Sequence, residues 1–306
     1  MTKTNRMLLA ALLVLVMVFT AACTGKDANT TTTTAATGND TQSTQPGITE
    51  PAAEELQPVL DVVGTVLYDR DGVRITVTDY NPDLSYGPKF YVSIANSTDR
   101  VVRVSTELLS VNGYMINDGV NLYKDVAADT EEEDYILLSN EFMGRCGIRQ
   151  LCNIAFYVYV LDPETNVPLS EPQLVTLDVT AQCNQTVDTT GQELYNKDGI
   201  RIIFKGVDSD ELYEGAVYFL IENNSGENIS VYTNTITLNS VTVDNILWTD
   251  VRDGTAALDC FYLEYLSDYE LESLAQIETV TVKFQLIDFD TMDGIDTCDY
   301  VTINVK

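Results

Sequence analysis

The chain has 306 residues, of which 45% are apolar and 21% are charged, so it can bury one or two hydrophobic cores. Its formal net charge of −30 makes nucleic acid an unsuitable partner and would attract cations, basic proteins or basic wall components. An acidic surface also simply keeps a domain soluble. Because the chain has no histidine, Ser-His-Asp and Cys-His catalysis and zinc sites of the usual mixed type are excluded.

Residues 1–22 are typical of a secretion signal. Two basic residues precede an apolar run, 7–19, which is too short to span a bilayer as a permanent helix. The small residues directly before Cys23 resemble the bacterial lipobox, although Thr20 stands where that motif usually has leucine. The resemblance implies that Cys23 is acylated and anchors the protein to the membrane. The alternative is an ordinary secretory signal cut near Ala22.

Residues 23–61 then form the lipidated cysteine and a flexible tether. From residue 24 to about 58 the chain consists mostly of Thr, Ala, Gln, Asn, Gly and acidic residues, which cannot build a core. A flexible segment of this length has a root-mean-square reach of roughly 30–35 Å. The tether would therefore hold the folded part clear of the lipid headgroups.

The rest of the chain contains one domain twice. Residues 64–117 align without a gap with 191–244 at a constant shift of 127, and about 15 of the 54 pairs are identical. The later halves align with slightly different shifts, so the duplication spans the whole domain. We expect domains at 62–180 and 191–306, joined by a polar decapeptide, 181–190, with little to pack.

Both copies show the alternation of apolar and polar residues that marks half-buried strands, as at Val73, Ile75 and Val77. Turn residues such as Asp71-Gly72 and Asn112-Gly113 separate the strands. Seven or so short strands in about 115 residues predict an all-β fold of two tandem β-sandwiches.

One short helix is expected in each copy. Residues Ser267 to Glu270 have the spacing of a capping box, and apolar residues follow at helical spacing, which predicts a helix at about 268–276. The counterpart in the first copy, Ser139 to about Gln150, contains two glycines and is predicted to be shorter or irregular.

Three motifs carry a family resemblance; the second copy repeats the first two in similar form and departs from the third at Ser240-Val241. They are Leu-Tyr-Asp-x-Asp-Gly-Val-Arg-Ile at 67–75, Ile-x-Asn-x-Ser/Thr at 94–98 and Val-Asn-Gly-Tyr-Met at 111–115. Together with the lipobox and the Thr-rich tether, they resemble uncharacterised immunoglobulin-like lipoproteins of Gram-positive, clostridial-type bacteria. The resemblance covers both copies and implies two immunoglobulin-like sandwiches outside the cytoplasm. It implies no activity, because the motifs are signatures of turns and cores.

Five cysteines follow the predicted anchor. Cys146 and Cys152 are close enough in sequence for a local bridge, and Cys260 and Cys298 both fall in the second copy, where they could link two strands. The odd cysteine, Cys183, lies in the connector and is the candidate for a free thiol.

An acidic turn near the C-terminus is the sharpest candidate for a metal site, although the sequence predicts no resident cofactor. Asp288, Asp290, Asp293 and Asp296 surround a glycine and could ligate a hard cation such as Ca²⁺. Their spacing misses the EF-hand loop. The alternative is an acidic turn between two strands that satisfies its own backbone without a metal.

Aromatic residues offer candidates for surface contacts. The chain has 17 tyrosines, and those that recur in both copies, such as Tyr68/Tyr195 and Tyr91/Tyr218, are assigned to packing. Trp248, which aligns with Tyr123, is assigned to packing as well. Tyr114 and Tyr232 have no aromatic counterpart in the other copy and are better candidates for contact with a sugar or a protein.

The sequence predicts no catalytic residue. We expect a lipid-anchored, extracytoplasmic protein that acts without catalysis, in binding or adhesion at the cell envelope, with an envelope protein or a glycan as its partner. One alternative is a passive spacer. The other is a hydrolase that works through two carboxylates, for which this acidic chain offers many unspecific pairs.

Overall fold

The computed structural model describes residues 59–82, 85–116, 121–181, 185–210, 213–233, 235–243 and 247–305. The predicted signal, Cys23, residues 24–58 of the tether and Cys183 lie outside these residues. The last residues assigned to the tether, 59–61, belong to the folded part, since the Leu60 N–H donates to the Val179 carbonyl at 2.8 Å. Within the described ranges no helix has the length and apolar character needed to cross a membrane.

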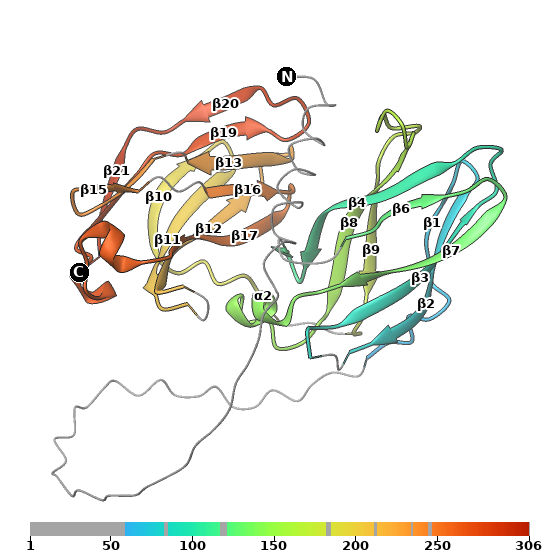
Figure 1. Cartoon of the computed structure of the whole chain (residues 1–306), viewed down its shortest axis with the longest axis horizontal. Helices are drawn as coiled ribbons and strands as arrows, with labels where there is room; N and C mark the ends of the chain where they lie inside the picture. The colour runs from blue at the N-terminus through green and yellow to red at the C-terminus, as the bar shows by residue number, and fades with distance from the viewer. Residues whose placement is uncertain are drawn as a thin grey trace, which may run out of the picture.

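The first sandwich consists of two antiparallel layers (Figure 1). One layer has the strand order β1 (Val66–Arg70), β2 (Val73–Asn81), β3 (Lys89–Asn96) and β7 (Thr130–Leu137). In the other, β4 (Val102–Val111) pairs with β8 (Asn153–Leu161), which pairs with β9 (Gln173–Asp178). The short strands β5 (Tyr114–Met115) and β6 (Tyr123–Val126) also pair with β4. Apart from β1, this is the strand partition of an immunoglobulin-like sandwich.

The second sandwich repeats this arrangement. Its first layer has the order β10 (Gln192–Lys197), β11 (Ile200–Asp208), β12 (Gly215–Asn223) and β17 (Thr255–Leu263). The facing layer is split into two four-stranded sheets. One sheet has the order β16 (Leu247–Val251), β13 (Ile229–Thr233), β19 (Gln285–Asp288) and β20 (Gly294–Thr297). The other has the order β15 (Val241–Val243), β14 (Ile236–Leu238), β18 (Thr279–Val282) and β21 (Val301–Asn304).

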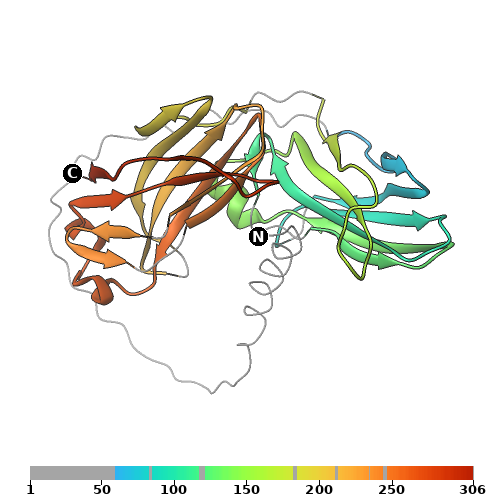
Figure 2. The same ribbon diagram turned by 90° about the horizontal axis from the view of Figure 1, so that it is seen from above.

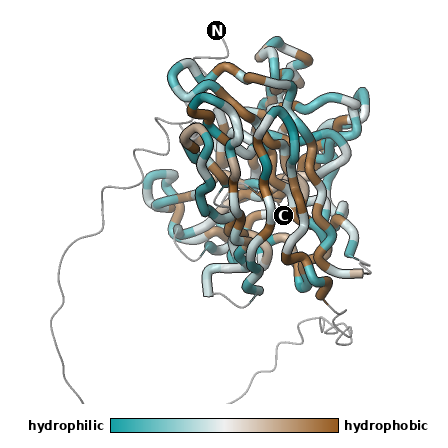
Figure 3. The backbone as a smooth tube through the Cα atoms, turned by 90° about the vertical axis from the view of Figure 1, so that its right-hand side faces the viewer, coloured by the Kyte–Doolittle hydropathy of each residue, from teal (hydrophilic) through white to brown (hydrophobic). Residues whose placement is uncertain are grey.

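The split has a counterpart in the first sandwich. Strand β4 has a bulge between Glu107 and Ser110, with Leu108 in the left-handed conformation at φ 54°. At the corresponding place in the second sandwich the strand is interrupted, between β13 and β14. The predicted all-β fold of two tandem sandwiches is confirmed, and the alternation of residues fits the layers, since Val73, Ile75 and Val77 are all buried. Figure 3 shows hydrophobic and hydrophilic residues alternating along the strands.

The short helix predicted in the first copy is confirmed, but the continuous helix predicted at about 268–276 in the second copy is not. The first sandwich has a short α-helix, α2 (Asn140–Arg145), and the Ser139 hydroxyl caps it by accepting a hydrogen bond from the Phe142 N–H at 3.2 Å. In the second sandwich the predicted helix is replaced by two 3₁₀ turns, η1 (Leu266–Tyr269) and η2 (Leu274–Gln276). Glu270 lies between them at φ 58°, a left-handed conformation that a continuous helix cannot contain.

Both predicted disulfides were wrong. Cys146 is a thiol at the end of α2, whereas Cys152 is disulfide-bonded, though not to Cys146, Cys260 or Cys298. Cys260 and Cys298 are both thiols. They lie in different layers, because Cys260 is in β17 and Cys298 follows β20, where its sulfur accepts a hydrogen bond from the Phe284 N–H at 3.0 Å.

The two sandwiches share one sheet (Figures 1 and 2). Strand β5 of the first pairs in parallel with β17 of the second, and the Ala256 N–H donates to the Gly113 carbonyl at 2.9 Å. Apolar contacts cross the same seam. Ile203, Leu220 and Leu258 of the second sandwich belong to the hydrophobic core of the first. The halves therefore meet through a packed, hydrogen-bonded interface.

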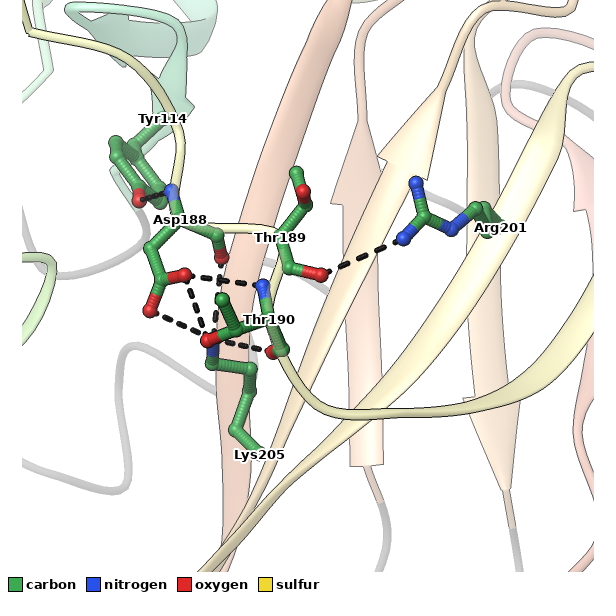
Figure 4. Close-up of polar contacts among 6 residues, drawn as sticks. All are labelled: Tyr114, Asp188, Thr189, Thr190, Arg201 and Lys205. Carbon is green, nitrogen blue, oxygen red and sulfur yellow. Dashed lines mark hydrogen bonds and ion pairs between the residues drawn. The ribbon is translucent and has the colours of Figure 1, made fainter.

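The connector between the sandwiches is held by hydrogen bonds and by packing, contrary to the expectation that it has little to pack (Figure 4). Val187 packs against the first core. The Asp188 N–H donates to the Tyr114 hydroxyl at 2.8 Å, and the Lys205 ammonium donates to the Asp188 carboxylate at 2.9 Å and to the Thr190 carbonyl at 2.6 Å. The connector thus bonds to both sandwiches. Tyr114, predicted as a surface contact, is instead 3% exposed.

Candidate functional site

Four side chains form a row across the split layer of the second sandwich. Trp248 of β16 lies opposite Tyr232 of β13 in the strand register. Tyr232 in turn lies opposite Gln285 of β19, and Gln285 lies opposite Thr297 of β20. Residues opposite one another project to the same side of a sheet. The residues that alternate with these four along the strands are buried in the core, so the four side chains of the row face solvent. We call this solvent side of β16, β13, β19 and β20 the Trp248 face.

Trp248 and Tyr232 are stacked on each other. Their ring centroids are 5.2 Å apart and their planes differ by 19°. The polar end of each ring is also held. The Tyr232 hydroxyl donates to Gln285 Oε1 at 2.6 Å, and Trp248 Nε1 donates to Asp250 Oδ1 at 3.1 Å. Trp248 remains 43% exposed. The pair is therefore ordered by its own contacts before a ligand arrives, which lowers the entropy cost of binding.

An open concavity of about 420 Å³ lies beside the stack, over β19 and β20. Its size is at the small end of the roughly 300–1,000 Å³ typical of ligand pockets. Trp248 covers one side of the Tyr232 ring, and Tyr232 is itself part of the lining. The full lining comprises Tyr232, Gln285, Leu286, Ile287, Met292, Gly294, Ile295, Asp296 and Thr297.

The carboxylate in this concavity is already paired. Asp296 accepts hydrogen bonds from the Lys197 ammonium at 2.9 Å and from the Tyr195 hydroxyl at 2.8 Å. The bond from Lys197, followed by that from Tyr195, lowers the pKa of Asp296 to about 2. Its negative charge is therefore permanent at neutral pH and is balanced locally by Lys197. The concavity itself presents little net charge.

The four predicted calcium ligands do not converge. Across the described part of the chain, no group of three or more acidic or thiol side chains is placed to hold a metal ion. Asp288 ends β19 and accepts a hydrogen bond from the Thr291 N–H at 2.6 Å, Asp290 and Asp293 are exposed, and Asp296 pairs with Lys197. The Asp288 N–H also donates to the Asp293 carbonyl. The segment is thus a turn that satisfies its own backbone, and calcium binding stays an untested prediction.

The corresponding side of the first sandwich is built differently. We call it the Tyr123 face. Tyr123 is 58% exposed, but the Arg103 guanidinium lies 4.7 Å from its ring centroid. Arg103 forms two hydrogen bonds with the Asp125 carboxylate, at 2.6 and 2.8 Å, and a third with Asn166 at 2.7 Å. At the place of Tyr232 this face has the small residue Ser105. Tyr159 of β8 lies opposite Ser105, and its ring is tilted by 57° against that of Tyr157 with the centroids 6.5 Å apart. The described residues of this face therefore include aromatic rings but no parallel stack like that of Trp248 and Tyr232.

The packing interpretation of Trp248 and Tyr123 was wrong, since both are exposed. Tyr232 is half-buried and lines the concavity, and its contact with a sugar or a protein stays a prediction. The signal that could have identified the Trp248 face is in the repeat itself. Arg103 and Ser105 of the first copy align with Ser230 and Tyr232 of the second, so at these two positions the second copy lacks the cation and has an aromatic residue beside Trp248. At the next position of the row, Tyr159 of the first copy aligns with Gln285.

A smaller pocket, of about 210 Å³, lies at the junction of the sandwiches. Its charged groups already have partners in the protein. Lys205 bonds to Asp188, and Arg145 bonds to Glu141 at 2.8 Å. Because Tyr114, which also lines it, holds the connector, we assign this pocket to the joint and not to a ligand.

No protein-family model matches the chain, and no curated protein matches it by sequence. Solved structures with a similar course of the backbone include the YadV chaperone, with 10% identity, a TM-score of 0.25 and coverage of 76% of this chain and 100% of that one. A chicken interferon gamma receptor alpha chain gives 8% identity, a TM-score of 0.23 and coverage of 70% and 92%. The calcium binding domain CBD12 of CALX1.1 gives 13% identity, a TM-score of 0.20 and coverage of 65% and 73%. Similarity at this level does not bear on function.

Proposed function

We propose that this protein is a lipid-anchored, extracytoplasmic binding protein of the cell envelope, and that its ligand surface is the Trp248 face. The observation that carries the proposal is the stacked, exposed Trp248–Tyr232 pair beside an open concavity. Large aromatic side chains dominate binding energetics, and ordered ones lose little entropy on binding. Such a pair on the surface has no evident role in holding the fold together.

The membrane part of the proposal rests on the sequence before the folded region. An apolar signal followed by small residues and Cys23 supports acylation at that cysteine. Several acyl chains, at about 0.8 kcal/mol for each buried methylene, would retain the protein on the membrane. Cys23→Ala is expected to release the protein into the medium, which fractionation of cells would show. Retention of this variant in the membrane fraction would contradict anchoring.

A rigid spacer is the second candidate, and the shared sheet and the pinned connector favour it. A spacer needs the joint but has no use for the Trp248 face. The two functions therefore differ in what happens when Trp248 is replaced.

Binding to purified cell envelopes tests the proposal. The protein would be the chain from residue 23 onward with Cys23→Ser, so that it stays in solution. We expect sedimentation with envelopes, a loss of at least about tenfold in affinity for Trp248→Ala, and wild-type affinity for the matched control Tyr123→Ala. Equal binding by all three proteins, or binding by none, would contradict the proposal and would favour the spacer function instead.

A further inference from the structure

We propose that the concavity of the Trp248 face takes an uncharged glycan, with a pyranose ring packed against Tyr232. This inference rests on the proposed function and names the class of its ligand. It follows from the charge, the polarity and the shape of the lining.

The charges argue against ionic ligands. The described residues that line the concavity include neither lysine nor arginine, and the chain as a whole carries a net charge of −30, so an anionic ligand would meet repulsion without a partner. A cationic ligand would need a carboxylate that is not already paired. Asp296 is the one carboxylate among the described residues that line the concavity; its charge is balanced by Lys197, and it also accepts from the Tyr195 hydroxyl. An uncharged ligand is the one that this lining suits.

The polarity of the lining matches a sugar. Gln285 and Thr297 bring amide and hydroxyl groups, while Ile287, Met292 and Ile295 bring apolar surface. Gln285 Oε1 already accepts from the Tyr232 hydroxyl, so its amide nitrogen is the end that would donate to a ligand. A pyranose ring has the same mixture, with apolar C–H faces and a rim of hydroxyl groups. Ligand sites commonly combine apolar walls with a few polar groups that fix orientation.

The stack sets where the ring would lie. Trp248 is on β16 and covers Tyr232 from that side, whereas the concavity lies toward β19 and β20 on the other. The Tyr232 ring therefore forms one side of the concavity, and the Trp248 ring packs against its other face. A sugar that packs its C–H face against the Tyr232 ring would place its hydroxyl rim over Gln285 and Thr297, which follow in the same row.

A peptide added as a strand to the edge of β20 would be a different class of ligand. Strand β20 has only four residues, Gly294–Thr297, so strand addition could form few hydrogen bonds there. Such an addition would also make no use of the Trp248–Tyr232 stack on the face of the sheet. The glycan uses both the stack and the polar row, and we favour it for that reason.

The chain has a single tryptophan, so its intrinsic fluorescence reports on Trp248 directly. The chain from residue 23 onward with Cys23→Ser would be titrated with the neutral hexasaccharides cellohexaose, maltohexaose and N-acetylchitohexaose, and with the charged hexagalacturonic acid and hexaglucosamine. We expect a saturable change in Trp248 emission with at least one neutral hexasaccharide, at an affinity at least about tenfold above that for either charged one. Tyr232→Ser, which installs the residue of the first sandwich, should abolish the change, and Tyr123→Ala should preserve it.

No saturable change with the neutral hexasaccharides, or equal affinity for charged ones, would overturn the inference. Sedimentation with envelopes separates this failure from that of the proposed function. An excess of the neutral hexasaccharides should abolish Trp248-dependent sedimentation, and protease treatment of the envelopes should not. The opposite pattern would mean that the Trp248 face binds a protein, so the proposed function would stand and the glycan inference would fall.

Discussion

The Trp248 face and the Tyr123 face occupy the same position on two copies of one sandwich, yet they differ in what they expose. On the Tyr123 face, Arg103 lies over the aromatic ring and is held by Asp125. On the Trp248 face, Ser230 replaces the arginine, and the retained Asp250 accepts instead from Ser230 and Trp248. The same carboxylate thus fixes a cation in one copy and an aromatic side chain in the other.

Residues that stabilise the fold, unlike those of the two faces, are the same in both copies. Asn96 donates to the carbonyl groups of Arg100 and Val126, and Asn223 donates to those of Glu227 and Val251. Asn112 and Asn239 also correspond, each at a φ near 50° and each accepting from two consecutive backbone N–H groups. The comparison separates residues that the sandwich needs from residues that one copy alone has acquired.

The largest effect is expected at the shared asparagines. Asn223→Ala should lower the free energy of unfolding by about 2–4 kcal/mol, because Asn223 is fully buried and its loss leaves the Glu227 and Val251 carbonyls without their donor. Asn96→Ala should have a similar cost. Urea unfolding would measure both, with the exposed neighbour Asn224→Ala as control. A cost below about 0.5 kcal/mol at either position would mean that these asparagines do not hold the turns.

The next effect concerns the difference between the faces. Ser230→Arg rebuilds the Arg103 arrangement beside Asp250, so a guanidinium should cover Trp248 as it covers Tyr123. We expect this variant to lose at least about tenfold in affinity for envelopes, or about 1.4 kcal/mol. Because Ser230 is fully buried, the larger side chain should also lower the free energy of unfolding, by about 1–3 kcal/mol. Unchanged affinity in a folded Ser230→Arg protein would show that exposure of Trp248 does not matter.

A smaller effect is expected at the joint between the two copies. Tyr114→Phe removes the oxygen that accepts the hydrogen bond from the Asp188 N–H and should cost about 1 kcal/mol of unfolding free energy. The highly exposed Tyr86→Phe is the control. If urea unfolding finds no difference between the two variants, the connector is not held in the way that Figure 4 shows.

The smallest effect is a pH dependence at the same joint. The bond from Lys205, followed by those from Thr190, lowers the pKa of Asp188 from 3.8 to about 2. A carboxyl whose folded-state pKa is lowered stabilises the fold above its unfolded pKa and loses that contribution as the pH falls from about 4 to about 2. Because the Asp188 side chain is 62% exposed, we expect about 0.5 kcal/mol or less.

Asp188→Asn should remove this part of the pH dependence. The measurement is the difference in unfolding free energy between pH 5 and pH 2.5, which should be smaller in the variant than in the wild type. A larger difference in Asp188→Asn would reverse the sign and contradict the assignment.

Much of the fold could be predicted from the sequence because a duplication displays its own constraints. The alternation of apolar and polar residues from Val73 to Val77 and the repeated Asp-Gly turns were sufficient to predict the strands and the β-sandwich fold. The helix in the second copy could not be predicted well, since the capping-box pattern at Ser267 does not reveal that Glu270 adopts a left-handed conformation. Sequence spacing likewise does not show that Cys260 and Cys298 lie in different layers.

The joint and the candidate site were harder to predict for different reasons. The connector has a polar composition, but its backbone finds a partner in Tyr114, 74 positions away. The alignment of Trp248 with another aromatic residue favours packing, but that single pair carries no information about the residues beside it. Reading Ser230 and Tyr232 together with Trp248 would have indicated an acquired surface.

Hydrogen–deuterium exchange with and without solubilised envelope material tests the central claim most directly, namely that one of two equivalent faces has become a ligand surface. The account predicts slower exchange in β20 and the turn before it, Phe289–Thr297, and unchanged exchange in β6 and β9 of the first sandwich. Protection of β6 and β9 to the same extent, or protection confined to the first sandwich, would contradict it.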